Sequence, residues 1–124
     1  MQFDPRVQDA LREVGLDDEA IRRADELVRE AVADEADRLT AFFEEHDRLY
    51  ADLDRAHSDR EVEAVTVDRL DCYTHGADLR GYLRFDTWGA YVEGGRVLDD
   101  GVVELTLGPT VHDRVRFATD RAQL

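Results

Sequence analysis

Apolar residues recur at helical spacing through most of the first half of the chain. They fall mainly three or four residues apart, as they do on one face of an α-helix. The members of this stripe are Ile21, Ala24, Leu27, Val28, Ala31, Val32, Leu39, Phe42, Phe43, Leu49, Tyr50 and Leu53. Three acidic residues, Asp17, Asp18 and Glu19, precede it and favour a helix N-terminus through the helix dipole. The pattern predicts a helix that can run as far as His57, a length of about 40 residues or about 60 Å.

A shorter helix is predicted before the long one. Asp4 followed by Pro5 has the form of an N-cap and a first helical residue. Gly15 has the form of a C-terminal cap. The apolar residues between these ends are Val7, Leu11 and Val14.

The second half of the chain has the composition of β-strands. Four runs are rich in β-branched and aromatic residues, at 62–67, 79–92, 102–107 and 111–117. Residues 93–96 and 99–101 are turn signals, and Gly108 with Pro109 separates the last two runs. These positions predict an antiparallel sheet of about four strands.

The order of the elements predicts an α+β fold, with one short and one long N-terminal helix packed on a C-terminal antiparallel sheet. A chain of 124 residues is the size of one domain, in which 1–58 form the helical half and 61–118 the β half. The long helix exceeds what one small sheet can cover. It therefore either bends near 33–37 or packs partly against another copy of the chain.

The charge of the chain indicates the salt concentration in which the protein folds. Thirty Asp and Glu face 16 basic residues, all of them Arg, and the formal net charge is −14. Such a charge destabilises a compact state by self-repulsion unless ions screen it, and at 1 M salt the screening length is about 3 Å. Arg is also more weakly hydrated than Lys and forms forked contacts with carboxylates. The composition therefore predicts a halophilic protein, because a bias of codons toward Arg would not explain the negative charge.

Two segments carry a resemblance to a known group of proteins. The opening Met1 to Arg6 and the run Leu79 to Gly89 resemble those of a family of small, acidic haloarchaeal proteins of unknown function. The resemblance covers most of the chain. It implies an archaeal source and supplies no catalytic residue.

The chain has the features of a cytoplasmic protein. No apolar stretch approaches the roughly 18 residues that span a membrane, and no basic and then apolar leader opens the sequence. Cys72 is the single cysteine, which forbids an internal disulfide and suits a reducing compartment. We expect no membrane partner.

The long apolar stripe favours a non-enzymatic protein-protein interaction module that self-associates as a homodimer. Its surplus surface is expected to meet a second copy or another protein. His46 would lie in this interface as a hydrogen-bonded histidine and Trp88 as an anchor. The interface candidates are Phe42, Phe43, His46, Leu49, Tyr50, Leu53 and Trp88.

A small metal-binding protein or enzyme is the first alternative. Cys72 and His75 have a spacing that would chelate zinc, and His112 with Asp71 or Asp113 would complete a tetrahedron. Cys72 with either histidine would also make a nucleophile and its base. The simpler interpretation is that Cys72 is a small buried residue and His75 ends a strand. The chain has no phosphate loop, dinucleotide fingerprint, nucleophile elbow or paired zinc motif.

Nucleic-acid contact is the second alternative. Arg114 and Arg116 alternate with apolar residues, so both would project from one face of a strand. Tyr82 and Arg84 on a neighbouring strand would add stacking and phosphate contacts. The simpler interpretation is that these arginines pair with carboxylates of the same chain. The acidity of the chain does not favour this partner.

The halophilic interpretation makes a direct prediction about stability. Between about 0.1 M and 2 M KCl the melting temperature should rise, because added ions screen the repulsion among carboxylates. Thermal unfolding followed by circular dichroism measures this dependence. A melting temperature that stays constant over this range would refute the prediction.

Overall fold

The computed structural model describes residues 3–52, 62–108 and 113–124. Two helices open the chain, α1 at Pro5–Glu13 and α2 at Asp18–Glu45. The side chain of Asp4 accepts the backbone N–H of Arg6 at 2.7 Å, and that of Asp17 accepts the N–H of Ala20 at 2.8 Å. Hydrogen bonds from the side chain and then the backbone of Arg6 lower the pKa of Asp4. Both predicted helix starts are therefore confirmed.

Gly15 ends α1 as the sequence predicts. Its φ is 101°, in the left-handed region that glycine adopts without strain. The N–H of Gly15 bonds to the carbonyl of Arg12 at 3.0 Å, and the N–H of Leu16 to that of Leu11 at 3.1 Å. This pair of bonds is a Schellman cap, which reverses the chain and sends α2 back along α1.

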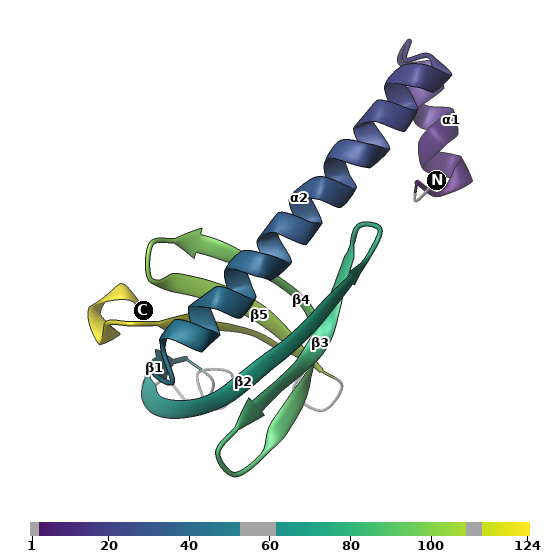
Figure 1. Ribbon diagram of the computed structural model, residues 1–124. Coiled ribbons are helices and arrows are strands. Elements are labelled where there is room, and N and C mark those ends of the chain that lie inside the picture. The colour runs from purple at the N-terminus through teal and green to yellow at the C-terminus, as the bar shows by residue number, and fades with distance from the viewer. Residues whose placement is uncertain (1–2, 53–61, 109–112) are drawn as a thin grey trace.

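Within the described residues, six strands follow the helices and close into a barrel (Figure 1). Each strand pairs antiparallel with its neighbour in sequence, and β1 also pairs with β6. A 3-10 helix at Arg121–Gln123 follows the last strand. The strands are β1 at Arg48–Ala51, β2 at Glu63–His75, β3 at Asp78–Phe85, β4 at Gly89–Asp99, β5 at Val102–Gly108 and β6 at Asp113–Ala118.

The α+β class is confirmed broadly, but the sheet has six strands and not about four. The helix ends at Glu45 instead of continuing toward His57, and Leu49 and Tyr50 lie in β1. In β1, Leu49 and Ala51 are fully buried while Arg48 is exposed, which is the alternation of a strand. Over the four residues of β1, the apolar pattern fits both a helix and a strand, so periodicity alone could not tell the two apart.

The run at 79–92 contains two strands where one was predicted, with a turn at 86–88 between β3 and β4. The predicted turn at 93–96 lies inside β4, where the pairing with β5 shifts between Val92 and Gly94. The turn at 99–101 is confirmed, with Gly101 at a φ of 77°. The register shift shows that Gly94 follows a β-bulge, which is a position where a strand bends.

The second half of α2 covers the barrel and completes its core. Ala36, Leu39 and Phe43 are buried with the inward-facing side chains of all six strands. The ring of Phe43 meets that of Phe117 edge to face, with centroids 5.3 Å apart. The first half of the helix continues beyond the barrel, with α1 beside it (Figure 1). Neither described helix is long and apolar enough to cross a membrane.

The contact between α2 and β4 predicts different costs for two adjacent glycine substitutions. A Cβ at Gly95 would stand 2.7 Å from a methyl of Leu105 and 3.0 Å from one of Leu39, whereas at Gly94 the nearest atom is 3.6 Å away. We expect Gly95→Ala to lower the free energy of unfolding by about 1–3 kcal/mol. Gly94→Ala, the matched control, should change it by less than about 1 kcal/mol. Equal effects in denaturant titrations at molar salt would contradict this packing.

Candidate functional site

The part of the molecule beyond the barrel is a two-helix arm. We define the arm as α1, the link to α2 and residues 18–31 of α2. The guanidinium of Arg12 donates to Asp18 at 2.9 Å, and this hydrogen bond raises the pKa of Arg12. Ile21 is fully buried within the arm. One ion pair at the tip and one deeply buried side chain therefore help hold the two helices together.

Most of the arm's large apolar side chains are left in solvent. Val14 is 76% exposed, Leu27 48%, Val7 44% and Leu16 40%. These four are the exposed large aliphatic residues of the described chain, and all lie on the arm. No residue of α1 is buried, and the structure describes the whole of that helix. The apolar face of α1 is thus only partly covered.

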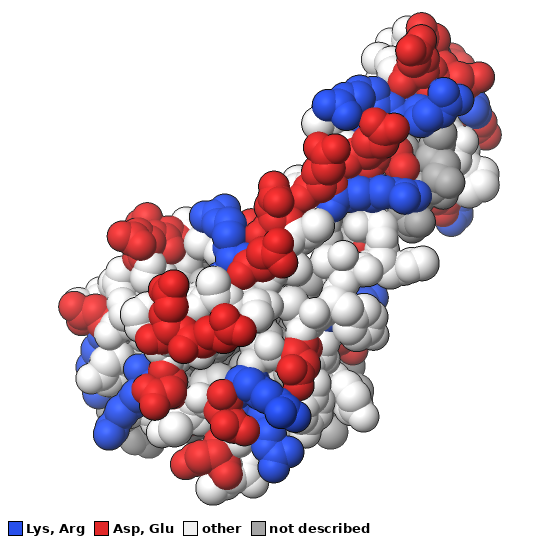
Figure 2. Space-filling model, in the orientation of Figure 1, with Lys and Arg blue, Asp and Glu red and all other residues white. Residues whose placement is uncertain are grey.

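The arm part of α2 also has apolar residues along one face. Ala20, Ala24, Leu27 and Ala31 follow one another at intervals of four, three and four residues, which place them along one side of a helix. Leu27 and Ala31 are exposed, and Ala20 and Ala24 are half-buried. On the face of the arm seen in Figure 2, acidic side chains alternate with bands of Arg. The arm therefore carries both exposed apolar and charged side chains.

A groove lies where the arm meets the barrel. It has a volume of about 440 Å³ and runs between α2 and the strands β3 and β4. Ala31, Val32, Leu79 and the backbone of Gly94 and Gly95 form its apolar wall. We call this the base groove.

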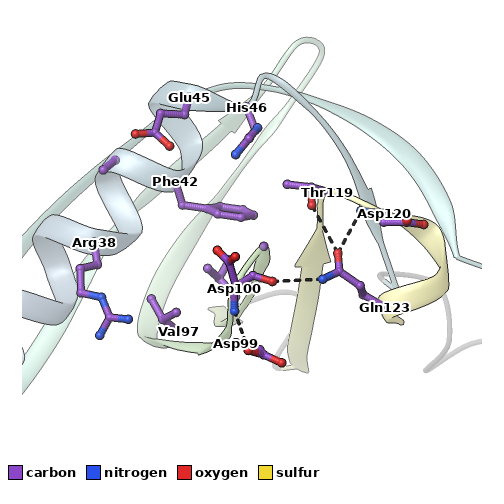
Figure 3. A pocket seen from close by; sticks show the side chains of 13 residues that line it. Arg38, Phe42, Glu45, His46, Val97, Asp99, Asp100, Thr119, Asp120 and Gln123 are labelled. Atoms are coloured by element: carbon purple, nitrogen blue, oxygen red, sulfur yellow. Dashed lines mark hydrogen bonds between the residues drawn. The ribbon is translucent and has the colours of Figure 1, made fainter.

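A second cleft, of about 830 Å³, opens at the other end of α2 (Figure 3). Gln123 donates to the carbonyl of Asp100 at 3.0 Å and accepts the N–H of Asp120 at 3.1 Å, which ties the C-terminal 3-10 helix to the turn between β4 and β5. The rings of Phe42 and His46 lie 5.3 Å apart at the opposite wall. Its acidic lining residues are Glu45, Asp99, Asp100 and Asp120. Their charges disfavour anionic ligands in this cleft.

The predicted interface residues are divided between the core and the surface. Phe43 and Leu49 are buried in the barrel core, so neither lies on a free surface. Phe42, His46 and Tyr50 are half-buried. Trp88 is 42% exposed and stacks on Phe85 at 4.4 Å. Leu53 lies outside the described residues.

The predicted zinc ligands are not brought together within the described part of the chain. Cys72 faces α2, where its sulfur lies 3.3 Å from the hydroxyl of Thr40 and 3.6 Å from the carbonyl of Ala36. His75 is exposed three residues later on β2, and such residues project to opposite faces of a strand. His112 lies outside the described residues. Among those described, no group of three His, Cys, Asp or Glu side chains is placed to hold a metal ion.

Arg116, one of the arginines predicted to contact nucleic acid, pairs with a buried carboxylate of its own chain. Its guanidinium lies 3.5 Å from Glu104 on β5, and Arg96 on β4 lies 3.1 Å from the same carboxylate. The three residues are cross-strand neighbours, and the Glu104 side chain is only 9% exposed. Arg114 is also exposed. Arg116 thus helps to shield a carboxylate.

Tyr82 and Arg84 lie on the outer face of β3. Arg84 lies 3.6 Å from Asp68, and the ring of Tyr82 meets that of Tyr91 with centroids 5.6 Å apart. The Tyr82 hydroxyl also lies over Gly89, where a Cβ would approach it to 2.2 Å. Both predicted residues therefore contact their own chain.

A family model described as a family of unknown function, DUF7532, matches residues 1–122. The chain belongs to DUF7532. Comparisons with curated proteins and with solved structures find no match. The family match spans the arm and the barrel together. This DUF7532 chain is therefore matched as one unit, and not as a barrel with an added arm.

The sequence did not lead us to predict that the arm of this DUF7532 protein carries exposed apolar residues. Val7, Val14 and Leu27 were recognised as members of helical stripes but not as interface candidates. The available signal was the shortness of α1, because nine residues are too few to cover a neighbouring helix along much of its length. The candidate interface was placed near Phe42 instead, at the end of α2 that the barrel covers.

The paired arginines predict a specific cost for removing the charge of Glu104. Glu104→Gln keeps the size of the side chain but weakens two charged contacts at a buried site, and should lower the free energy of unfolding by about 1–2 kcal/mol. Glu93→Gln, on the exposed face of β4, is the control and should change it by less than about 0.5 kcal/mol. Denaturant titrations at molar salt measure both. Equal effects would show that the arginines do not stabilise Glu104.

Proposed function

We propose that this protein is a non-enzymatic interaction module that forms a homodimer through its helical arm. The observation that carries the proposal is the gathering of four exposed aliphatic side chains on the arm. Scattered apolar residues are normal on protein surfaces, whereas an apolar face on a projecting element is typical of an association site.

The arm has little support of its own. Isolated helices shorter than about 12 residues are marginal in water, and α1 has nine residues, none of them buried. The 14 residues of α2 in the arm extend about 21 Å beyond the barrel contact. A second copy laid along the arm would bury Val7 and Leu27 and would stabilise both helices.

The spacing of the α2 face suits pairing with an identical chain. Intervals of four, three and four residues are the same when counted from either end. In an antiparallel pair, Ala20 would therefore face Ala31 of the second copy, and Ala24 would face its Leu27. This is the self-complementary contact that a two-fold dimer requires. Alanine at these positions allows the helix axes to approach closely.

The charge of the protein sets the conditions under which the arms would meet. Two copies, each with a formal charge of −14, repel one another at low salt. Molar salt shortens the range of that repulsion to about 3 Å. The proposed setting is therefore the high-salt cytoplasm of a halophilic archaeon, which the absence of Lys also supports.

Light scattering coupled to size exclusion tests the dimer. In 2 M KCl we expect twice the mass of one chain, and lowering the salt to about 0.1 M should shift the equilibrium toward monomer because repulsion is less screened. Leu27→Glu should give monomer at 2 M KCl, since it would bury two carboxylates at the contact. A monomeric mass for the unchanged protein at every concentration up to about 1 mM, the range of weak association, would overturn the proposal.

The control for Leu27→Glu is Ala33→Glu. Ala33 is exposed on the same helix, and the offset of six positions places it about 120° from Leu27 around the helix axis. This variant adds the same charge away from the contact and should remain dimeric. Circular dichroism would verify that both variants retain their helices.

A further inference from the structure

The tip of the arm and the base groove are complementary parts of one chain that cannot meet within it. We propose that in the dimer the apolar tip of each arm seats in the base groove of the second copy. This inference rests on the proposed dimer, and it names the contact that would fix how the two arms align along each other. Its ligand is a second copy of the same chain.

The tip presents two large apolar side chains. Val14 is 76% exposed and Leu16 40% exposed, and they flank Gly15 where the chain reverses. Leu16 is also held by the hydrogen bond from its N–H to Leu11. The tip is therefore a preformed apolar knob, whose seating would require little further ordering of the backbone.

The base groove has the character of a matching hole. Val32 and Leu79 form part of its apolar wall, and Gly94 and Gly95 contribute backbone without side chains to the β4 side. A Cβ at Gly94 would lie in ordinary van der Waals contact with the side chain of Thr106, at 3.6 Å, so this position accepts a side chain without a clash. An aliphatic side chain that enters the groove would leave water for an apolar wall.

The dimensions of the arm bring the two parts together. If Ala24 of one copy faces Leu27 of the other, residue 16 of the tip lies level with residue 35 of the second α2. Residue 35 is Glu35, which lines the base groove. The register that pairs the alanines thus also carries each tip to the opposite groove, and the two-fold axis repeats the contact.

The area of the arms shows why this second contact matters. Helices of about 10 Å diameter, about 21 Å long in the arm part of α2 and about 14 Å long in α1, offer a footprint of roughly 350 Å² a copy. That is roughly 700 Å² in total, below the roughly 1,200 Å² at which stable interfaces begin. Two seated tips would add the area that the arms alone lack.

The charges around the two parts favour high salt. The tip carries Glu13, Asp17, Asp18 and Glu19, of which Asp18 pairs with Arg12. The groove carries Arg80 and Arg96 beside Glu35, Asp78 and Glu93. The acidic tip thus meets a margin of mixed sign, and the remaining repulsion is screened at molar salt.

Crosslinking between chosen positions tests the seating. In a Cys72→Ser background, Leu16→Cys is combined with Gly94→Cys and treated at 2 M KCl with a thiol crosslinker shorter than 10 Å. Within one chain, tip and groove are separated by about 21 Å of helix, so this reagent joins them only between copies. We expect a covalent dimer from the double variant and none from either single variant.

The control combines Leu16→Cys with Thr119→Cys, because Thr119 lines the cleft at the opposite end of α2. It should give no covalent dimer. If light scattering shows a dimer but Leu16 and Gly94 do not crosslink, the seating is wrong and the proposed function stands. If the unchanged protein is monomeric and the double variant does not crosslink, both proposals are overturned.

Discussion

The packing of the second half of α2 on the barrel is the contact on which the rest of the structure depends. Leu39 and Phe43 are the largest helical side chains in a core otherwise built from the inward faces of six strands. Gly95 allows the helix to approach β4, and Cys72 meets the helix through Thr40. β1 pairs with β2 only at residues 63–66. The helix α2 contacts β2 as well, so without it β2 would lose much of its packing. The helix is therefore part of the barrel core and not an addition to it.

The length of the same helix creates the arm. A continuous helix of 28 residues is about 42 Å long, more than a six-stranded barrel of this size can cover. Its apolar face is thus shared between two environments, the barrel core near Phe43 and the open arm near Leu27. The arm combines exposed aliphatic side chains with a helical scaffold anchored in the core. This combination supports association as the proposed role, since the exposed surface is held in position before a partner arrives.

Electrostatics and packing act on different parts of the molecule. Carboxylates cover the arm and the barrel, and Arg side chains lie among them (Figure 2). At Glu104 two arginines shield one carboxylate, whereas Arg12 on α1 pairs both with Asp9 of its own helix and with Asp18 at the start of α2. These contacts stabilise individual positions, whereas the chain as a whole keeps a formal net charge of −14. Screening by salt therefore bears on the stability of the fold and on any approach of a second copy.

Local features of the chain could be predicted from the sequence because each depends on a few neighbouring residues. The caps at Asp4, Gly15 and Asp17, the turn at Gly101 and the α+β order of elements belong to this group. The tertiary structure decided where α2 ends, that the described sheet has six strands and that β1 closes the barrel. It decided as well whether each apolar residue points into the core or into solvent. It also decided that Cys72 and His75 point apart and that Arg116 meets Glu104. The physical reason is that periodicity identifies which residues share a face, whereas the partner of that face depends on contacts between segments far apart in the chain.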